Sequence, residues 1–328
     1  MSTLLIGGYT GDKGAGTGIT VLDGDLASGH QITATVPANC ASWIARHPEL
    51  PVLYAVQETA DGHVQAWSLA DGAPGEPLGC SATGGAEPAH LTVDSSGHFL
   101  ITANYSGGSI SVHELGADGS IGRQTDLVRH EQHGEADRQE QAHPHMIRDI
   151  GGTLLVTDLG GDAIYRYRLG PGGKLMPEGV VATPPGSGPR HVLPVGDHYY
   201  VTAELSGQVL GYDAAGRLLS AVPASNADGP NQPSELASNG KYLYVANRGP
   251  DTVSVFALDG TSQGRPFPRY VTEVHVGAWP RHIAIADDLL YVANERSHEV
   301  MVLRIDPATG VPAHAQTIEV PSPTVVLP

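Results

Sequence analysis

The sequence has little cysteine, no long apolar run and few basic residues, and each shortage excludes a class of protein. Its 328 residues include two cysteines, Cys40 and Cys80. Two are too few for a disulfide framework, so we expect reduced thiols and a cytoplasmic location. The opening residues MSTLLIGGYT lack the basic start and the long apolar stretch of a signal peptide. No apolar run has the length of a membrane span, and we expect no membrane partner.

Basic residues are outnumbered by acidic ones. Eighteen Lys and Arg stand against 35 Asp and Glu, which leaves a formal net charge of -17. This charge repels nucleic acid and anionic membranes at long range, so nucleic acid is not an expected partner. An anionic small molecule can still bind if several of the few cations gather at one point.

Glycine and proline are abundant and recur between short apolar runs, as turns do in an all-β fold. Six segments begin with a proline, continue through an apolar run that ends in small polar residues, and close with a second apolar run. These leading prolines are Pro88, Pro144, Pro189, Pro233, Pro280 and Pro323. Neighbouring leading prolines are separated by 56, 45, 44, 47 and 43 residues. A period in the mid-forties, rich in Val, Ile, Tyr and Thr, is typical of four-stranded propeller blades.

The two ends of the chain complete a seventh unit. LLIGGYT, from Leu4, matches the second strand of a unit, and SPTVVLP at the C-terminus matches a first strand. Pairing them would remove an exposed sheet edge. With no linker in between, the sequence predicts an all-β, seven-bladed β-propeller, a single domain over 1–328, closed by its terminal strands in one blade. A two-sheet sandwich or an open array of repeats is the alternative.

The longest separation between leading prolines, from Pro88 to Pro144, contains a charged insertion, residues 129–145. A loop of this length is either a solvated connection or a functional flap over a site.

Polar residues at the start of the first strand and the end of the second strand of each unit should share one mouth of the ring, because these strands form an antiparallel hairpin. The residue after the leading position is charged or titratable in three units, as His145, Arg190 and Arg281. Glu204 ends a second strand, and Arg248 follows another. The fold does not require these irregular members of a repeat, so they are candidate site residues.

Three of the few arginines are thus expected at one mouth. A guanidinium group binds carboxylate or phosphate in a bidentate manner. The alternative is that these arginines merely pair with local acids, namely Glu58, Glu204 and Glu295.

The next residue along the strand is histidine in three units, His90, His191 and His282. A repeated histidine favours a structural role, such as bonding a neighbouring loop. Because this column shares the mouth, we also assign His191 and His282, together with His143, to substrate binding.

At these positions the sequence resembles the seven-bladed β-propeller lactonase family, which includes bacterial 6-phosphogluconolactonase and the fungal carboxymuconate-lactonising enzyme. The resemblance covers the whole chain and rests on Gly7-Gly8-Tyr9-Thr10, Arg138-Gln139-Glu140, His143-Pro144-His145, Gly188-Pro189-Arg190-His191, Ala203-Glu204-Leu205 and Val245-Ala246-Asn247-Arg248. It implies a hydrolase that opens an anionic sugar lactone, and it places the family's catalytic set on His145, Arg190, Glu204 and Arg248.

Such a reaction needs an activated water, a site for the developing oxyanion and an anchor for the substrate anion. Glu204 or His145 is the expected general base. Arg190 and Arg248 are expected to bind the oxyanion and the anion, and Arg281 a distal phosphate or carboxylate. No cofactor is expected, the partner is a small anionic lactone or carboxylate, and the chain should be a monomer or a weak homo-oligomer.

Three alternatives remain open. The same residues could run the reverse chemistry of a muconate-type cycloisomerase. A propeller can also be a non-catalytic binding scaffold, although a scaffold should carry an apolar patch at the mouth and aromatic residues are only 5% of the chain. A zinc-dependent lactonase is the third, because His143 and His145 lie two residues apart. The spacing specifies no further ligands, so we expect no metal.

Overall fold

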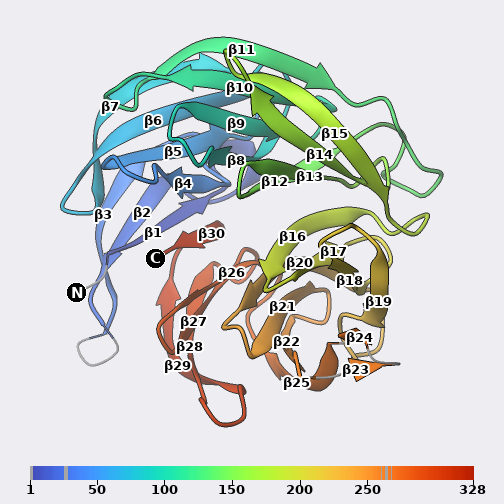
Figure 1. Ribbon diagram of the computed structural model, residues 1–328. Coiled ribbons are helices and arrows are strands. Elements are labelled where there is room, and N and C mark those ends of the chain that lie inside the picture. The colour runs from blue at the N-terminus through green and yellow to red at the C-terminus, as the bar shows by residue number, and fades with distance from the viewer. Residues whose placement is uncertain (1–2, 26–28, 260, 263–264, 267) are drawn as a thin grey trace.

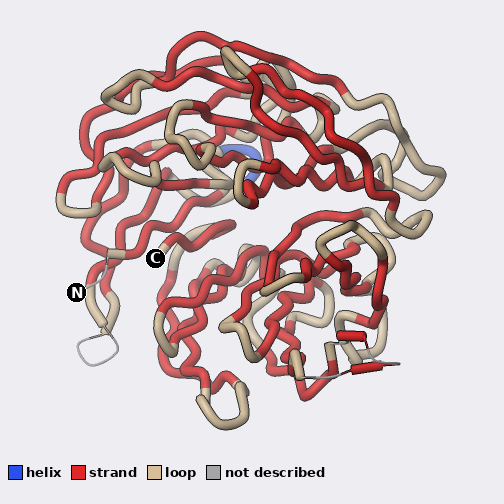
Figure 2. The backbone as a smooth tube through the Cα atoms, in the orientation of Figure 1, coloured by secondary structure: helices blue, strands red, loops and turns tan. Residues whose placement is uncertain are grey.

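A computed structural model describes residues 3–25, 29–259, 261–262, 265–266 and 268–328. In this part of the chain, seven four-stranded antiparallel sheets form a ring (Figures 1 and 2), with one short ribbon and one 3-10 turn, Gly11–Lys13, outside the sheets. The predicted all-β, seven-bladed propeller is confirmed. Met1 and Ser2, which belong to the predicted domain, lie outside the described residues.

The chain builds its blades in sequence, each from the ring axis outward. The blade that joins the chain ends contains β30 (Pro323–Leu327), β1 (Leu4–Gly8), β2 (Gly18–Asp23) and β3 (Gln31–Pro37). The next contains β4 (Ile44–Arg46), β5 (Val52–Gln57), β6 (His63–Ala70) and β7 (Ala73–Ala82). The third contains β8 (Pro88–Val93), β9 (Phe99–Asn104), β10 (Ser109–Leu115) and β11 (Ile121–Arg129). The fourth contains β12 (Pro144–Ile150), β13 (Thr153–Asp158), β14 (Ala163–Gly170) and β15 (Lys174–Ala182).

The remaining three blades follow the same plan. The fifth contains β16 (Pro189–Val195), β17 (His198–Ala203), β18 (Gln208–Asp213) and β19 (Leu218–Pro223). The sixth contains β20 (Gln232–Ser238), β21 (Tyr242–Arg248), β22 (Thr252–Ala257) and β25 (Arg269–His275), and the ribbon β23 (Thr261–Ser262) with β24 (Arg265–Pro266) precedes its last strand. The seventh contains β26 (Pro280–Ala286), β27 (Leu289–Asn294), β28 (Glu299–Ile305) and β29 (Pro312–Glu319).

Apolar clusters fill the space between neighbouring blades, one at each of the seven contacts. Each fully buried aliphatic or aromatic side chain contributes about 1.5–3 kcal/mol by leaving water. A blade alone would expose these faces, so the blades are stable only as a ring.

The ring closes through its two chain ends, as the sequence predicts. Strand β1 pairs antiparallel with β30, with Leu5 opposite Leu327 and Ile6 opposite Val326. On the adjoining interface, Leu4 and Ile6 pack against Tyr291 of β27.

A register irregularity interrupts the innermost strand of most blades directly after its leading proline. In the fourth blade, for example, Pro144 pairs with Asp158 and Met146 pairs with Thr157, which leaves His145 unpaired. The same break follows Pro88, Pro189, Pro233 and Pro280. A β-bulge turns its extra side chain away from the regular alternation. The bulged residues of separate blades therefore point to a shared region on the ring axis.

Candidate active site

A cavity of about 130 Å³ lies where the bulged residues meet. Its lining consists of Ser42, Trp43, Glu58, Ala89, Tyr105, Arg138, His145, Arg190, His191, Glu204, Arg248, Arg281 and Thr324. Six of the eight predicted site residues are in this lining, and they come from four blades. Their roles in binding and catalysis stay predictions.

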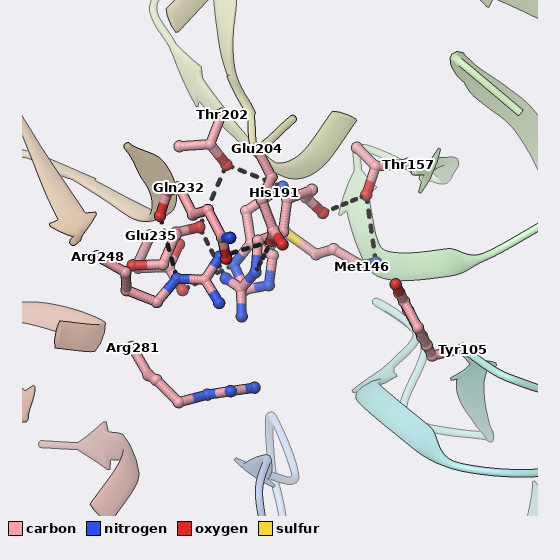
Figure 3. A network of polar contacts seen from close by, with 12 residues as sticks. Tyr105, Met146, Thr157, His191, Thr202, Glu204, Gln232, Glu235, Arg248 and Arg281 are labelled. Atoms are coloured by element: carbon pink, nitrogen blue, oxygen red, sulfur yellow. Dashed lines mark hydrogen bonds and ion pairs between the residues drawn. The ribbon is translucent and has the colours of Figure 1, made fainter. Parts of the chain in front are cut away.

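Glu204 is the centre of the charged side of the cavity. Its side chain is 1% exposed, and its carboxylate contacts three guanidinium groups, of which Figure 3 labels that of Arg248. Oε2 lies 2.6 Å from Arg248 Nη2 and 3.0 Å from Arg190 Nε. Oε1 accepts a hydrogen bond of 2.5 Å from Arg138 Nη1. One carboxylate therefore faces three cations, so this side of the cavity keeps a net positive charge.

The three arginines also determine the protonation of Glu204. Burial alone would raise the pKa of this carboxyl group, but the charges of Arg248, Arg190 and Arg138 hold the pKa well below its usual range. Both oxygens of this carboxylate are already in contact with guanidinium groups, which leaves Glu204 poorly placed to take a proton from water. Of the two predicted bases, Glu204 is thus better suited to holding the arginines in place.

Two of these guanidinium groups are oriented by backbone carbonyls. Arg190 Nη1 donates to Ser234 O at 2.7 Å, and Arg248 Nε donates to Gln232 O at 3.0 Å. Arg190 Nε and Arg248 Nη2 are buried beside Glu204 but make no well-aligned hydrogen bond. Both guanidinium groups belong to the cavity lining, where their charge can stabilise an oxyanion.

His145 is buried between Tyr105 and His191, with ring centroids 5.5 and 5.0 Å away. Its Nδ1 has no hydrogen-bond partner among the described residues. Burial, followed by the charge of Arg190, lowers the pKa of His145 well below its usual value. The imidazole is therefore neutral at neutral pH and able to accept a proton.

The opposite wall carries Arg281, which stands apart from the other arginines in Figure 3. Its Nη1 lies 3.2 Å from Glu295 Oε2, and Nη2 donates to the hydroxyl of Tyr9 at 2.9 Å. Tyr9 in turn donates to Glu58 at 2.8 Å, and Ser42 donates to the same carboxylate at 2.5 Å. This wall offers a cation together with a carboxylate and hydroxyl groups.

The sequence left open that the arginines merely form ion pairs with nearby acids, and the structure shows such pairs in part. Arg190, Arg248 and Arg281 do contact acids, but they do so around a shared cavity. The lining contains four arginines and two carboxylates, Glu58 and Glu204. Positive charge is thus in excess at this point of an otherwise acidic protein, which is the condition for binding a small anion.

His143 and His282, which we expected to contact the substrate, are not in the cavity lining. His143 stacks on Tyr105 at 4.3 Å, and its Nδ1 lies 3.0 Å from the Tyr105 carbonyl oxygen. His282 Nδ1 accepts the backbone N–H of Val326 at 3.3 Å. Nδ1 of each ring is thus engaged by a neighbouring backbone atom.

Arg138 and Tyr105 line the cavity but were absent from the predicted site. Arg138 belongs to the charged insertion, and its Nη2 donates to the Tyr105 hydroxyl at 2.9 Å. The insertion is anchored as well, since Gln139 is fully buried and donates to Leu159 O at 2.8 Å. The predicted flap is therefore the better description of this loop. Arg138 lies outside the repeat, so no column of the repeat could indicate it.

The described part of the chain contains no group of three or more His, Cys, Asp or Glu side chains arranged to bind a metal ion.

Comparisons with known proteins agree with this architecture. The family described as "Lactonase, 7-bladed beta-propeller" matches residues 3–328. The 6-phosphogluconolactonase of Bacillus subtilis (strain 168) is 30% identical over 305 residues, which cover 87% of this chain and 86% of the relative. The 6-phosphogluconolactonase of Formosa agariphila is 30% identical over 94% of this chain and 93% of its own. The solved structure of the periplasmic gluconolactonase of Pseudomonas aeruginosa superposes with a TM-score of 0.90 at 29% identity, covering 99% of this chain and 98% of that protein.

Proposed function

Since this chain belongs to the seven-bladed β-propeller lactonase family, we propose that it hydrolyses an anionic sugar lactone, of which 6-phosphogluconolactone is the first candidate. Two relatives at 30% identity are named for that substrate. The observation that carries the proposal is the arrangement of Arg138, Arg190 and Arg248 around the single carboxylate of Glu204. The positive excess matches a phosphate monoester, which carries about -1.5 to -2 charges at neutral pH.

The reaction adds one water molecule to the lactone. The water oxygen attacks the carbonyl carbon while one of its protons passes to His145, the neutral imidazole of the cavity. Negative charge develops on the carbonyl oxygen, and the guanidinium groups of Arg190 and Arg248 stabilise it. The ring carbon–oxygen bond then breaks, and the leaving ring oxygen takes the proton from His145. The product is the open hydroxy acid.

The opposite wall supports a sugar as the rest of the substrate. Glu58, Ser42 and Thr324 line it, and a carboxylate and hydroxyl groups can form hydrogen bonds with the hydroxyl groups of a sugar. Arg281 then remains for a distal phosphate or carboxylate. Charged walls of this kind are also unlike the apolar patch that a pure binding scaffold requires.

The test is turnover by the purified full-length chain on 6-phosphogluconolactone, gluconolactone and a carboxymuconate, each corrected for spontaneous hydrolysis. We expect the phosphorylated lactone to have the highest kcat/KM. Turnover of the carboxymuconate alone would establish the cycloisomerase alternative. No turnover of any lactone, by a chain that unfolds cooperatively, contradicts the proposal.

The cytoplasm is the proposed compartment, and a monomer or weak homo-oligomer the proposed state. Cys40 is buried and Cys80 is exposed, and both are free thiols, as a reducing compartment favours. None of the described segments forms a helix of the length and apolarity that a membrane crossing requires. Cell fractionation tests the compartment, because the Pseudomonas aeruginosa neighbour is a periplasmic protein. Gel filtration with light scattering tests the oligomeric state.

A further inference from the structure

Two histidines of the repeated column have the same surroundings. His90 Nδ1 accepts the backbone N–H of Ile147 at 3.4 Å, and His282 Nδ1 accepts that of Val326 at 3.3 Å. In each case the donor belongs to the innermost strand of the next blade. A ring nitrogen that accepts an N–H carries no proton, so both rings carry their proton on Nε2.

His191 occupies the same column but has a different partner. The next blade presents Glu235 at this point, and the backbone N–H of Leu236 donates to Glu235 Oε1 at 2.9 Å instead of to the histidine. Glu235 Oε2 lies 2.8 Å from His191 Nδ1 and 3.4 Å from His282 Nε2. Burial raises the pKa of Glu235, whereas the backbone N–H of Leu236 and the charge of Arg190 lower it. In its ionised form the carboxylate can only accept N–H groups, so His191 then carries its proton on Nδ1.

This assignment leaves Nε2 of His191 unprotonated. His191 Nε2 is buried without a hydrogen-bond partner in the described part of the chain, as is Nδ1 of the adjacent His145. Both residues line the cavity. A buried polar atom without a partner costs about 1–3 kcal/mol, and a bound water with two to four polar neighbours removes this cost.

We infer that Glu235 is a positioning residue for the attacking water. Its carboxylate keeps the proton of His191 on Nδ1, so that His191 Nε2 accepts one hydrogen bond from the water while His145 takes the other proton during attack. The inference rests on the proposed lactonase activity. Glu235 itself is not in the cavity lining and acts through His191.

The variant Glu235→Gln tests this inference at nearly constant size. Its amide oxygen must face the N–H of Leu236, so its NH2 group faces His191 and forces Nδ1 to become an acceptor. The proton of His191 then moves to Nε2, which can no longer accept from water. We expect kcat to fall by about 100-fold, since oriented proton transfer is worth about 10²–10⁴-fold, with KM changed less than about threefold.

The tautomer itself is read from the ¹⁵N shifts of the histidine rings, with the His191 signals assigned by their loss in His191→Asn. We expect an Nδ1-protonated ring in the wild-type protein and an Nε2-protonated ring in Glu235→Gln. The control is Glu178→Gln, which removes the carboxylate of an ion pair with Arg168 on an outer strand, away from the cavity. It should leave kcat unchanged.

The double variant Glu235→Gln, His191→Asn separates action through His191 from a purely structural role. If Glu235 acts through His191, the second substitution adds no further loss of kcat. Additive losses, an Nε2-protonated ring in the wild type, or unchanged kcat in Glu235→Gln each overturn the inference and leave the proposed function intact. Absence of wild-type turnover on every lactone overturns both.

Discussion

Replacing Glu204 by glutamine should destabilise the protein more than any surface charge substitution. The side chain is 1% exposed and contacts three guanidinium groups, at 2.5 Å for Arg138, 3.0 Å for Arg190 and 2.6 Å for Arg248. The amide keeps the size of the carboxylate and removes its charge. Three mutually repelling cations then remain without a counterion in a small cavity.

The expected loss follows from this burial. Removing one partner of a buried ion pair costs about 3–5 kcal/mol. With an unfolding entropy of about 2.1 cal/mol/K per residue, the 328-residue chain has about 0.7 kcal/mol/K in total. The melting temperature of Glu204→Gln should therefore fall by about 4–7 °C.

The assay is thermal unfolding with and without inorganic phosphate, which can supply the missing negative charge. Phosphate at about 100 times its Kd stabilises by about 2.7 kcal/mol, or about 4 °C for this chain, and the gain should be larger in the variant than in the wild type. The control is Glu178→Gln, whose carboxylate pairs with exposed Arg168 at 2.7 Å and should lose at most about 1 kcal/mol. An equal shift in the two variants, or no extra gain from phosphate, would refute this reasoning.

Four further outcomes are expected. Arg190→Ala should lower kcat by about 10²–10³-fold, as loss of an oxyanion donor does, while circular dichroism shows an intact fold. Because burial lowers the pKa of His145 and His191, the unfolded chain binds protons that the folded one does not, so the melting temperature should rise with pH up to about 6.5 and then level off. Arg138→Ala should raise KM for a phosphorylated lactone more than for gluconolactone, measured by steady-state kinetics. Activity should be the same before and after dialysis against a chelator; a loss restored by zinc would revive the metal-dependent alternative.

The blade count and the closure of the ring could be predicted because both depend on properties that are local in the chain. The spacing of the leading prolines measures the length of one blade, and continuous apolar runs mark strands buried on both faces. The half-units at Leu4 and Pro323 identify the closing blade, since each lacks the partner that the other supplies. The hairpin rule also brings His145 and Arg190 to one mouth, because it requires only two adjacent strands.

The finer chemistry of the site depends on contacts between blades, which no local pattern records. The bulge after each leading proline selects which residue turns inward, so His145 lines the cavity and His143 does not. Arg138 contacts Glu204 from an insertion outside the repeat. Glu235 can set the position of the proton on His191 because the fifth and sixth blades pack side by side, which places Glu235 Oε2 2.8 Å from His191 Nδ1. A column of histidines looks uniform in the chain, and only their partners across the ring make one of them different.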